Sequence, residues 1–240
     1  MSDAARLASV CFSGKPAGTN FQHYSPTSAE LTSIIATSEA AVIESAYAAA
    51  LSYAEAISGL QKGSVSWSIV KFYYSCFYCI RASLFLNGIV PFHGGKEMIL
   101  DTHNGKFFSG GRSSHHWNWN SIRNLSSMHG SWIISQDSQD SYEKLREHRE
   151  NVNYTHGFTD PYFHRCLISS EQDLAKRIRA YRDDVAFFYT YLPDHLAIAY
   201  PTKLIFNLDN AMQASSIILP DESLSHLKKI WVIKDRCPIT

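Results

Sequence analysis

The stretch "VSWSIVKFYYSCFYCIRASLFLNG", residues 65–88, is apolar on nearly every side when it is drawn as a helix. A helix without a broad polar face is stable only when its neighbours bury it, so this segment belongs in the centre of a helical bundle. Asn87 and Gly88 supply its stop, because Asn and Gly adopt the left-handed backbone that ends many helices. The wider apolar run of residues 69–92 contains two basic residues, an asparagine and a proline. We therefore expect the buried helix of a soluble protein rather than a membrane span.

Helical spacing of apolar residues marks five further segments. Each begins near a serine suited to capping or just after a proline, both of which are common at helix starts. No segment shows the sustained alternation that is typical of strands, so the predicted fold class is all-α. Residues 89–138 are rich in Gly, Ser, Asn and His and are expected to form an insertion of loops and short helices. The five further predicted helices span residues 28–57, 141–156, 169–192, 202–218 and 221–233.

The composition is that of a packed protein without a global charge field. The 240 residues contain 22 Lys and Arg and 22 Asp and Glu, so nucleic acid would have to bind a local patch. The five cysteines are scattered and odd in number, as in proteins with reduced intracellular thiols, and the first residues lack the pattern of a secretory signal. These features predict a cytoplasmic protein that does not associate with a membrane.

Short motifs that resemble redox, phosphate or metal sites lack the context that each chemistry needs. Cys76 and Cys79 have the CxxC spacing, but no strand precedes their helix and no second ligand pair is present, so we expect two small buried thiols. In "HGGKE" the P-loop spacing fails, and Glu97 stands where Ser or Thr should follow Lys96. The paired Glu-x-x-His motifs of a di-iron bundle do not occur. The sequence therefore predicts no metal and no cofactor.

The segment "GGRSSHHWNWN", residues 110–120, combines two adjacent histidines with two tryptophans and an arginine. Adjacent side chains point in different directions on a helix or a strand, so the histidines make a poor metal clasp. Arg112, Trp117 and Trp119 have the chemistry to stack on an RNA base or a partner. An aromatic anchor under a loop is the other interpretation.

Arg149 and His156 form the candidate catalytic pair. Seven residues advance a helix by about 700°, so the two side chains share a face and their Cα atoms lie roughly 10 Å apart along the axis. Asn153 lies between them, and Arg146 and Tyr142 continue the stripe toward the N-terminus. His156 precedes a glycine stop, where the negative end of the helix dipole favours its protonated form and keeps its titration near neutrality.

These residues match what metal-independent RNA cleavage requires. The reaction needs a base near neutral pKa for the ribose 2′-hydroxyl, a fixed cation for the phosphate charge and an acid for the leaving oxygen. One chain supplies half of this set, and a twofold dimer that brings two such helices together would complete it. The other interpretation is the solvated polar end of a helix.

Two blocks of the sequence together resemble HEPN domains. Residues 67–95 resemble the first core helix of these domains, which has a Tyr-Tyr pair, an Arg-Ala-Leu-Leu-like end, a Gly and then a His-Gly. Residues 142–156, "YEKLREHRENVNYTH", resemble the HEPN helix with the pattern R-x4-6-H, and Arg149 and His156 take the Arg and His positions. In the first block the matching residues are Tyr73, Tyr74, Arg81 to Leu84, Gly88, His93 and Gly94.

The resemblance covers about residues 30–190 and implies a four- or five-helix up-and-down bundle that dimerises with its R-x6-H helices facing one another. In many HEPN families this bundle is a metal-independent endoribonuclease that acts as a toxin, often in antiphage or stress systems. Arg149 would then stabilise the phosphate and His156 would serve as base or acid. The supporting residues would be Asn153, Tyr154 and Arg146.

The resemblance also implies RNA as substrate, a homodimer, and an antitoxin or regulatory partner protein. Other HEPN families have lost catalysis, so the alternative is a silent helical module that binds a partner protein or a nucleotide, with the residues around Trp117 to Trp119 as its contact surface. The expected organisation is an N-terminal arm, a bundle and a C-terminal helical extension, at residues 1–26, 27–192 and 193–240.

Overall fold

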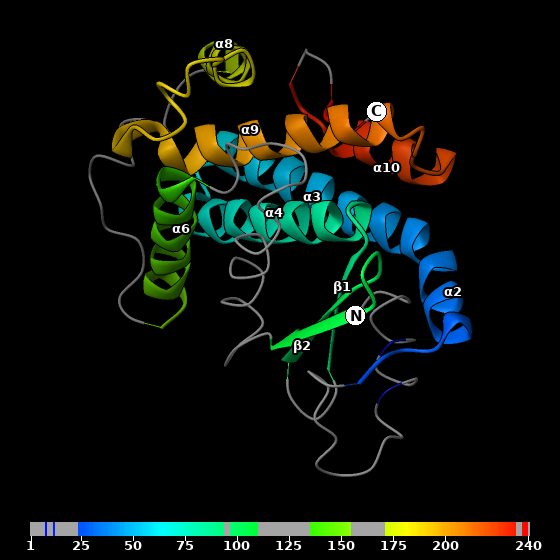
Figure 1. The fold of residues 1–240 in the computed structure, drawn as a ribbon. Coiled ribbons are helices and arrows are strands. Elements are labelled where there is room, and N and C mark those ends of the chain that lie inside the picture. The colour runs from blue at the N-terminus through cyan, green and yellow to red at the C-terminus, as the bar shows by residue number, and fades with distance from the viewer. Residues whose placement is uncertain are drawn as a thin grey trace. The chain divides into compact units, whose positions relative to one another are not determined.

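The structure of the chain is a computed structural model. It describes residues 8, 12, 24–93, 97–109, 135–154, 171–233 and 237–239, with the backbone alone at residues 93, 97, 109, 154, 171 and 172. Most of these residues are helical, which confirms a largely all-α fold (Figure 1). The chain divides into two compact units, residues 1–45 with 80–134 and residues 46–79 with 135–240. We describe each unit by itself.

The first unit opens with α2, Ser28–Ala36, and the start of α3, Ser38–Gln61. The Thr27 hydroxyl accepts a hydrogen bond from the Glu30 N–H, and the Glu30 carboxylate accepts one from the Thr27 N–H. This reciprocal capping box satisfies two donors that a helix start leaves open. The single helix predicted over this stretch is interrupted at Thr37, whose N–H and hydroxyl both bond back to α2.

A three-stranded antiparallel sheet follows in the first unit. Its strands are β1, Ile89–His93, β2, Glu97–Asp101, and β3, Lys106–Ser109, in the order β1-β2-β3. The prediction of loops and short helices is wrong for residues 89–93, 97–101 and 106–109, which form these strands. Each strand has only four or five residues, too few to show the sustained alternation that identifies strands in a sequence. The rest of the predicted insertion up to residue 134 lies outside the described residues.

Four aromatic rings hold the sheet to the N-terminal part of the first unit. The rings of Phe12, Tyr24, Phe92 and Phe107 pack with centroid distances of 5.0 to 6.0 Å. Phe12, Phe92 and Phe107 are buried. Phe12 and Tyr24 belong to the segment predicted as an arm, so at least these two residues contribute to packing.

The helix predicted from the apolar stretch is α4, Val65–Leu86, and its prediction is confirmed. Gly88 adopts a φ of 70°, in the left-handed region expected of the stop. Cys76, Cys79 and Cys237 are free and buried, as predicted for the CxxC pair. Burial raises the pKa of all three thiols, which makes them unreactive as nucleophiles at neutral pH.

The centre of the second unit is α9, Pro193–Ala214, which buries 14 of its 22 residues. The hydroxyls of Tyr53 on α3 and Thr202 on α9 lie 2.7 Å apart, and α6 and α8 also pack on α9 (Figure 1). The predicted start near residue 202 is wrong. The helix begins with Pro193 in its first turn, where a missing N–H costs nothing, and Pro201 lies inside it.

The helix predicted for residues 169–192 is shorter in the structure. α8, Glu171–Arg182, ends at a carbonyl that accepts a hydrogen bond from Lys203 Nζ of α9 at 3.1 Å. The following loop, residues 183–192, wraps around the buried Asp184 carboxylate. That carboxylate accepts four hydrogen bonds of 2.9 Å, from the N–H groups of Phe188, Tyr189 and Thr190 and from the Thr190 hydroxyl. The last helix, α10, spans Asp221–Ile230 and starts where the sequence predicts.

Two helical stretches are long and apolar enough to cross a membrane by length and composition, Ser28–Gln61 and Val65–Leu86. In α4, 67% of the most apolar window is buried inside the protein. The buried core helix of a soluble protein passes the same test, so the two stretches are weak support for a membrane location.

His195, at the start of α9, is expected to make stability sensitive to mild acid. Its Nδ1 lies 2.8 Å from the Tyr181 hydroxyl, and burial, followed by the nearby Arg177 charge, lowers its pKa. The imidazole of His195 binds a proton more readily in the unfolded chain than in the folded one. The contribution of neutral His195 to the free energy of unfolding is therefore complete above about pH 6.5 and is lost as the pH falls toward the folded-state pKa. We expect the urea midpoint to fall less between pH 7 and pH 5 in His195→Gln than in the wild type. Equal pH slopes in the two proteins would contradict this assignment.

Candidate functional site

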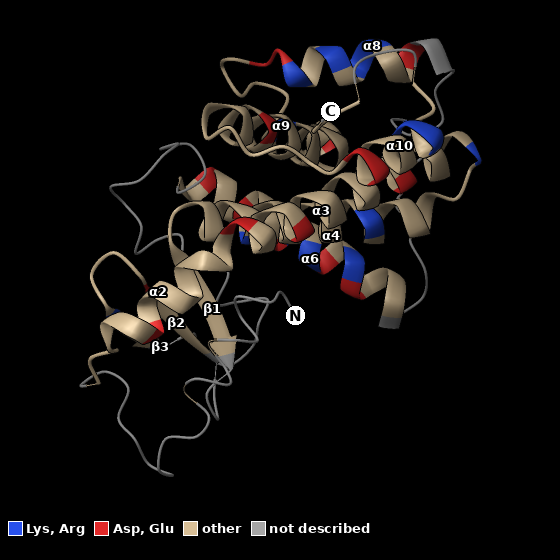
Figure 2. Cartoon of the chain, turned by 90° about the vertical axis from the view of Figure 1, so that its right-hand side faces the viewer, with Lys and Arg blue, Asp and Glu red and all other residues tan. Residues whose placement is uncertain are grey.

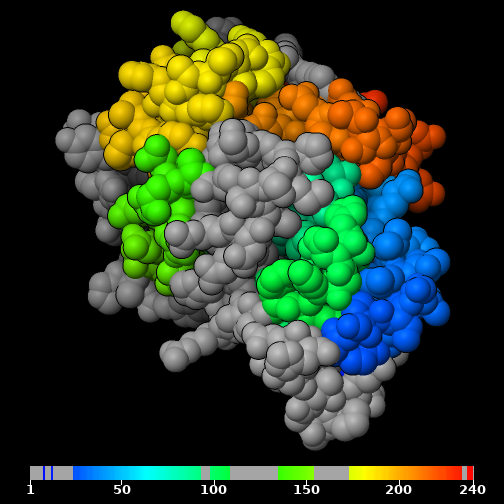
Figure 3. Space-filling model, viewed as in Figure 1, coloured from blue at the N-terminus to red at the C-terminus, as the bar shows by residue number. Residues whose placement is uncertain are grey.

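The predicted site lies on α6, Gln136–Tyr154, in the second unit. Ser138, Tyr142 and Leu145 form the core-facing stripe of this helix and are fully buried. Arg149 continues the stripe one turn later and keeps only 11% of its side chain exposed. Most of the Arg149 side chain is therefore covered by its neighbours and a small part reaches solvent, while other parts of α6 lie at the surface (Figure 3).

Two tyrosines of α4 receive this guanidinium. Arg149 Cζ lies 5.3 Å from the centroid of the Tyr73 ring and 5.7 Å from that of Tyr74, both within cation–π reach. The hydroxyls of Tyr73 and Tyr142 lie 3.2 Å apart. Burial raises the pKa of Tyr73 to about 12, against the opposing effects of the Tyr142 hydrogen bond and the Arg149 charge. Tyr73 therefore stays protonated at neutral pH and serves as a packing and hydrogen-bonding group, not as a base.

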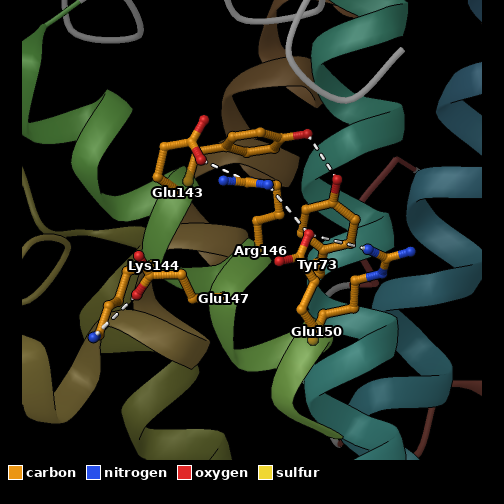
Figure 4. A network of polar contacts seen from close by, with 8 residues as sticks. Tyr73, Glu143, Lys144, Arg146, Glu147 and Glu150 are labelled. Carbon is orange, nitrogen blue, oxygen red and sulfur yellow. Dashed lines mark hydrogen bonds and ion pairs between the residues drawn. The ribbon is translucent and has the colours of Figure 1, made fainter. Parts of the chain in front are cut away.

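Arg146, three residues before Arg149, is held by two carboxylates. Its Nε donates to Glu143 Oε2 at 2.7 Å and its Nη1 donates to Glu150 Oε1 at 3.1 Å (Figure 4). The same Glu150 oxygen lies 3.8 Å from Arg149 Nη1. Two guanidiniums and two carboxylates balance in charge, so this part of α6 presents little net positive field.

The remaining predicted site residues lie at the end of the described helix or beyond it. Asn153 is exposed, one turn after Arg149. Tyr154 is the last described residue of α6, with its backbone alone, and His156 lies outside the described residues. The structure thus brings Arg149 and Arg146 together and puts Asn153 at the surface. The loop residues Arg112, Trp117 and Trp119 also lie outside the described part of the chain.

Sequence reasoning did not predict that Tyr73, Tyr74 and Glu150 would surround Arg149. The Tyr-Tyr pair is visible in the sequence as a landmark of the apolar helix, but nothing local says which residue it contacts. One signal was available. Tyr142 precedes Arg149 by seven residues, so both lie on one helix face, and an aromatic residue on that face has to meet a neighbouring helix.

No group of three or more His, Cys, Asp and Glu side chains within the described ranges is placed to hold a metal ion. Basic and acidic residues are interspersed along α6, whereas α8 carries its two acidic residues in the first turn and only basic charges after them (Figure 2). The groups that the structure places around Arg149 are two phenol rings and a carboxylate.

Comparison of the chain with models of protein families, with curated proteins and with solved structures gives no match.

Proposed function

We propose that the protein is a metal-independent endoribonuclease of HEPN type. One observation supports it above the others: the two sequence blocks that resemble HEPN domains are in contact. The Tyr73-Tyr74 pair of the first block packs against Arg149 of the second, and the hydroxyls of Tyr73 and Tyr142 meet although 69 residues separate them. An up-and-down bundle, a homodimer, a cytoplasmic location and a role as toxin or antiphage effector belong to the same proposal.

In this proposal Arg149 and His156 have separate roles. The cleavage reaction gathers negative charge on the phosphate, and a cation that is already oriented stabilises that charge without further reorganisation. The two tyrosine rings orient the Arg149 guanidinium in this way. His156 transfers the proton, and a second copy of the chain contributes the second histidine, so that one acts as base and the other as acid.

RNA cleavage in the presence of EDTA tests the proposal. We expect the wild type to cleave single-stranded RNA, and Arg149→Ala to lower the rate about 10²- to 10³-fold, as the removal of one charge-stabilising group does in other enzymes. His156→Ala is expected to lower it about 10²- to 10⁴-fold through the lost proton transfer. Lys144→Ala is the matched control on the same helix, because the Lys144 side chain is 58% exposed and pairs with Glu147. Its cleavage rate should equal that of the wild type.

A second variant separates catalysis from folding. Arg149→Lys keeps the positive charge and much of the packing on the two rings but loses the planar fork of the guanidinium. If Arg149→Lys unfolds at the wild-type temperature but does not cleave RNA, the loss of activity is due to the missing guanidinium. Cleavage at the wild-type rate in both Arg149 variants contradicts the site assignment.

The second candidate is a catalytically silent module that binds a partner protein, such as the antitoxin or regulator that the resemblance implies. Val185 and Phe188 favour it, because 84% and 66% of their surfaces are exposed on the loop that Asp184 holds in place. Apolar side chains on a fixed surface loop are typical of contact surfaces. A wild-type protein that cleaves no RNA pool in the EDTA assay would favour this module.

A further inference from the structure

One face of α4 in the second unit carries aromatic side chains that the core does not bury. Trp67, Lys71, Tyr74 and Tyr78 follow one another at spacings of four, three and four residues. This spacing keeps them within about 60° of one another around the helix and spreads them over roughly 16 Å. We call these four residues the α4 stripe.

The α4 stripe reaches solvent. Trp67 is 63% exposed, the Lys71 side chain is 39% exposed, and Tyr74 and Tyr78 are partly exposed. A single exposed aromatic residue needs no explanation. Three aromatic residues on one helix face offer rings on which the bases of single-stranded nucleic acid can stack.

The stripe is continuous with the candidate catalytic cation. The rings of Tyr74 and Tyr78 are stacked, with centroids 6.3 Å apart and an interplanar angle of 29°. Arg149 Cζ lies 5.7 Å from the centroid of the same Tyr74 ring. A strand whose bases stack on the stripe would therefore carry its backbone past Arg149.

We propose that the α4 stripe binds single-stranded RNA by stacking on its bases. The inference rests on the proposed ribonuclease function and names its substrate class. Duplex RNA does not fit this surface, because its bases are stacked on one another and cannot reach the rings. Lys71 pairs with Glu55 and Arg149 lies near Glu150, so phosphate contacts contribute little and the affinity depends weakly on salt.

Fluorescence anisotropy with a labelled, single-stranded 2′-O-methyl RNA of about eight nucleotides tests the stripe. This probe lacks the free 2′-hydroxyl and is not cleaved. We expect Trp67→Ala and Tyr78→Leu each to weaken binding about 5- to 100-fold, the range for loss of one stacked base. Phe108→Leu is the matched control, because Phe108 is an aromatic residue of β3 with 38% exposure that lies outside the stripe. It should bind like the wild type.

Two further measurements use the same probe. A duplex of the same sequence should bind at least about tenfold more weakly, and the slope of log K against log salt should be no steeper than about −1.4, which corresponds to two phosphate contacts. The stripe is overturned if the wild type does not bind the probe, if both stripe variants bind like the wild type, or if the duplex binds equally well.

The cleavage assay with Arg149→Ala distinguishes this outcome from failure of the proposed function. If RNA binding depends on Trp67 and Tyr78 but the wild type cleaves no RNA, the stripe proposal is supported and the ribonuclease proposal is contradicted. If RNA cleavage depends on Arg149 but RNA binding is unchanged in the Trp67 and Tyr78 variants, the ribonuclease proposal is supported and the stripe proposal is contradicted.

Discussion

Replacing Tyr142 by alanine is expected to lower the free energy of unfolding by about 3–5 kcal/mol, the range for deleting a large buried aromatic side chain. Tyr142 is fully buried on α6, and its ring centroid lies 5.6 Å from that of Tyr73 on α4. Alanine would leave a cavity at the place where these two helices meet. Urea denaturation followed by circular dichroism measures the loss.

Two variants show whether the ring or the hydroxyl is responsible. Tyr142→Phe keeps the ring and loses the contact between the two hydroxyls, so it should cost about 1 kcal/mol. Tyr78→Ala removes a partly exposed ring from α4 and should cost clearly less than Tyr142→Ala. A loss below about 1 kcal/mol for Tyr142→Ala would contradict the anchoring of α6 through this ring.

The second large effect is expected at Asp184, where Asp184→Asn should lower the free energy of unfolding by about 2–4 kcal/mol. The carboxylate accepts three backbone N–H groups and one hydroxyl. An amide has one acceptor oxygen, so its NH₂ group would face at least one of these donors. The loop also holds Phe187 at a φ of 56°, an unfavourable conformation for a bulky residue, and only the surrounding contacts maintain it.

The neighbouring acid provides the control for this prediction. Asp183 has 64% of its side chain exposed and pairs with Arg182 at 2.8 Å. Because surface ion pairs contribute little, Asp183→Asn should change stability by less than about 1 kcal/mol. Thermal unfolding of the two variants side by side, with limited proteolysis of the 183–192 loop, compares the same substitution in a buried and in an exposed place. Equal losses of stability in the two variants would show that the hydrogen bonds to Asp184 do not hold the 183–192 loop in its conformation.

The fold could be predicted where local signals suffice. The apolar stretch and Gly88 define α4, and Pro220 marks the start of α10. The end of α8 could not be predicted, because it depends on Asp184 and on Lys203 from another helix, and no Gly or Pro marks it. The three strands could not be predicted, because four or five residues are too few to show the alternation of apolar and polar residues.

The start of α9 shows a different limit. Pro193 and Pro201 each suit the first turn of a helix, and a proline inside a helix costs about 3 kcal/mol in isolation. The sequence alone therefore favours a helix that begins after Pro201. Burial of 14 residues offsets that cost, and burial depends on neighbours that a local pattern does not reveal.

Only the part of the candidate site that lies on α6 could be predicted from the sequence. The resemblance of two sequence blocks to HEPN domains singles out Arg149, and helix geometry aligns it with Tyr142. Its contact with the Tyr73-Tyr74 pair joins segments far apart in the sequence, so no local pattern contains it. The balance of Arg146 by Glu143 and Glu150 is the part that spacing could have indicated, since residues three and four apart on a helix are neighbours.

The division of the second unit into residues 46–79 and 135–240 has a consequence for synthesis on the ribosome. Tyr53 is made 149 residues before its partner Thr202. At about 5–20 residues per second, Tyr53 on α3 precedes its α9 partner by on the order of 10 s. During that interval two helices apolar enough to suit a membrane are without α9. We therefore expect the nascent chain to bind chaperones that shield apolar helices, and its yield in a cell to depend on them as well as on the stability of the finished fold.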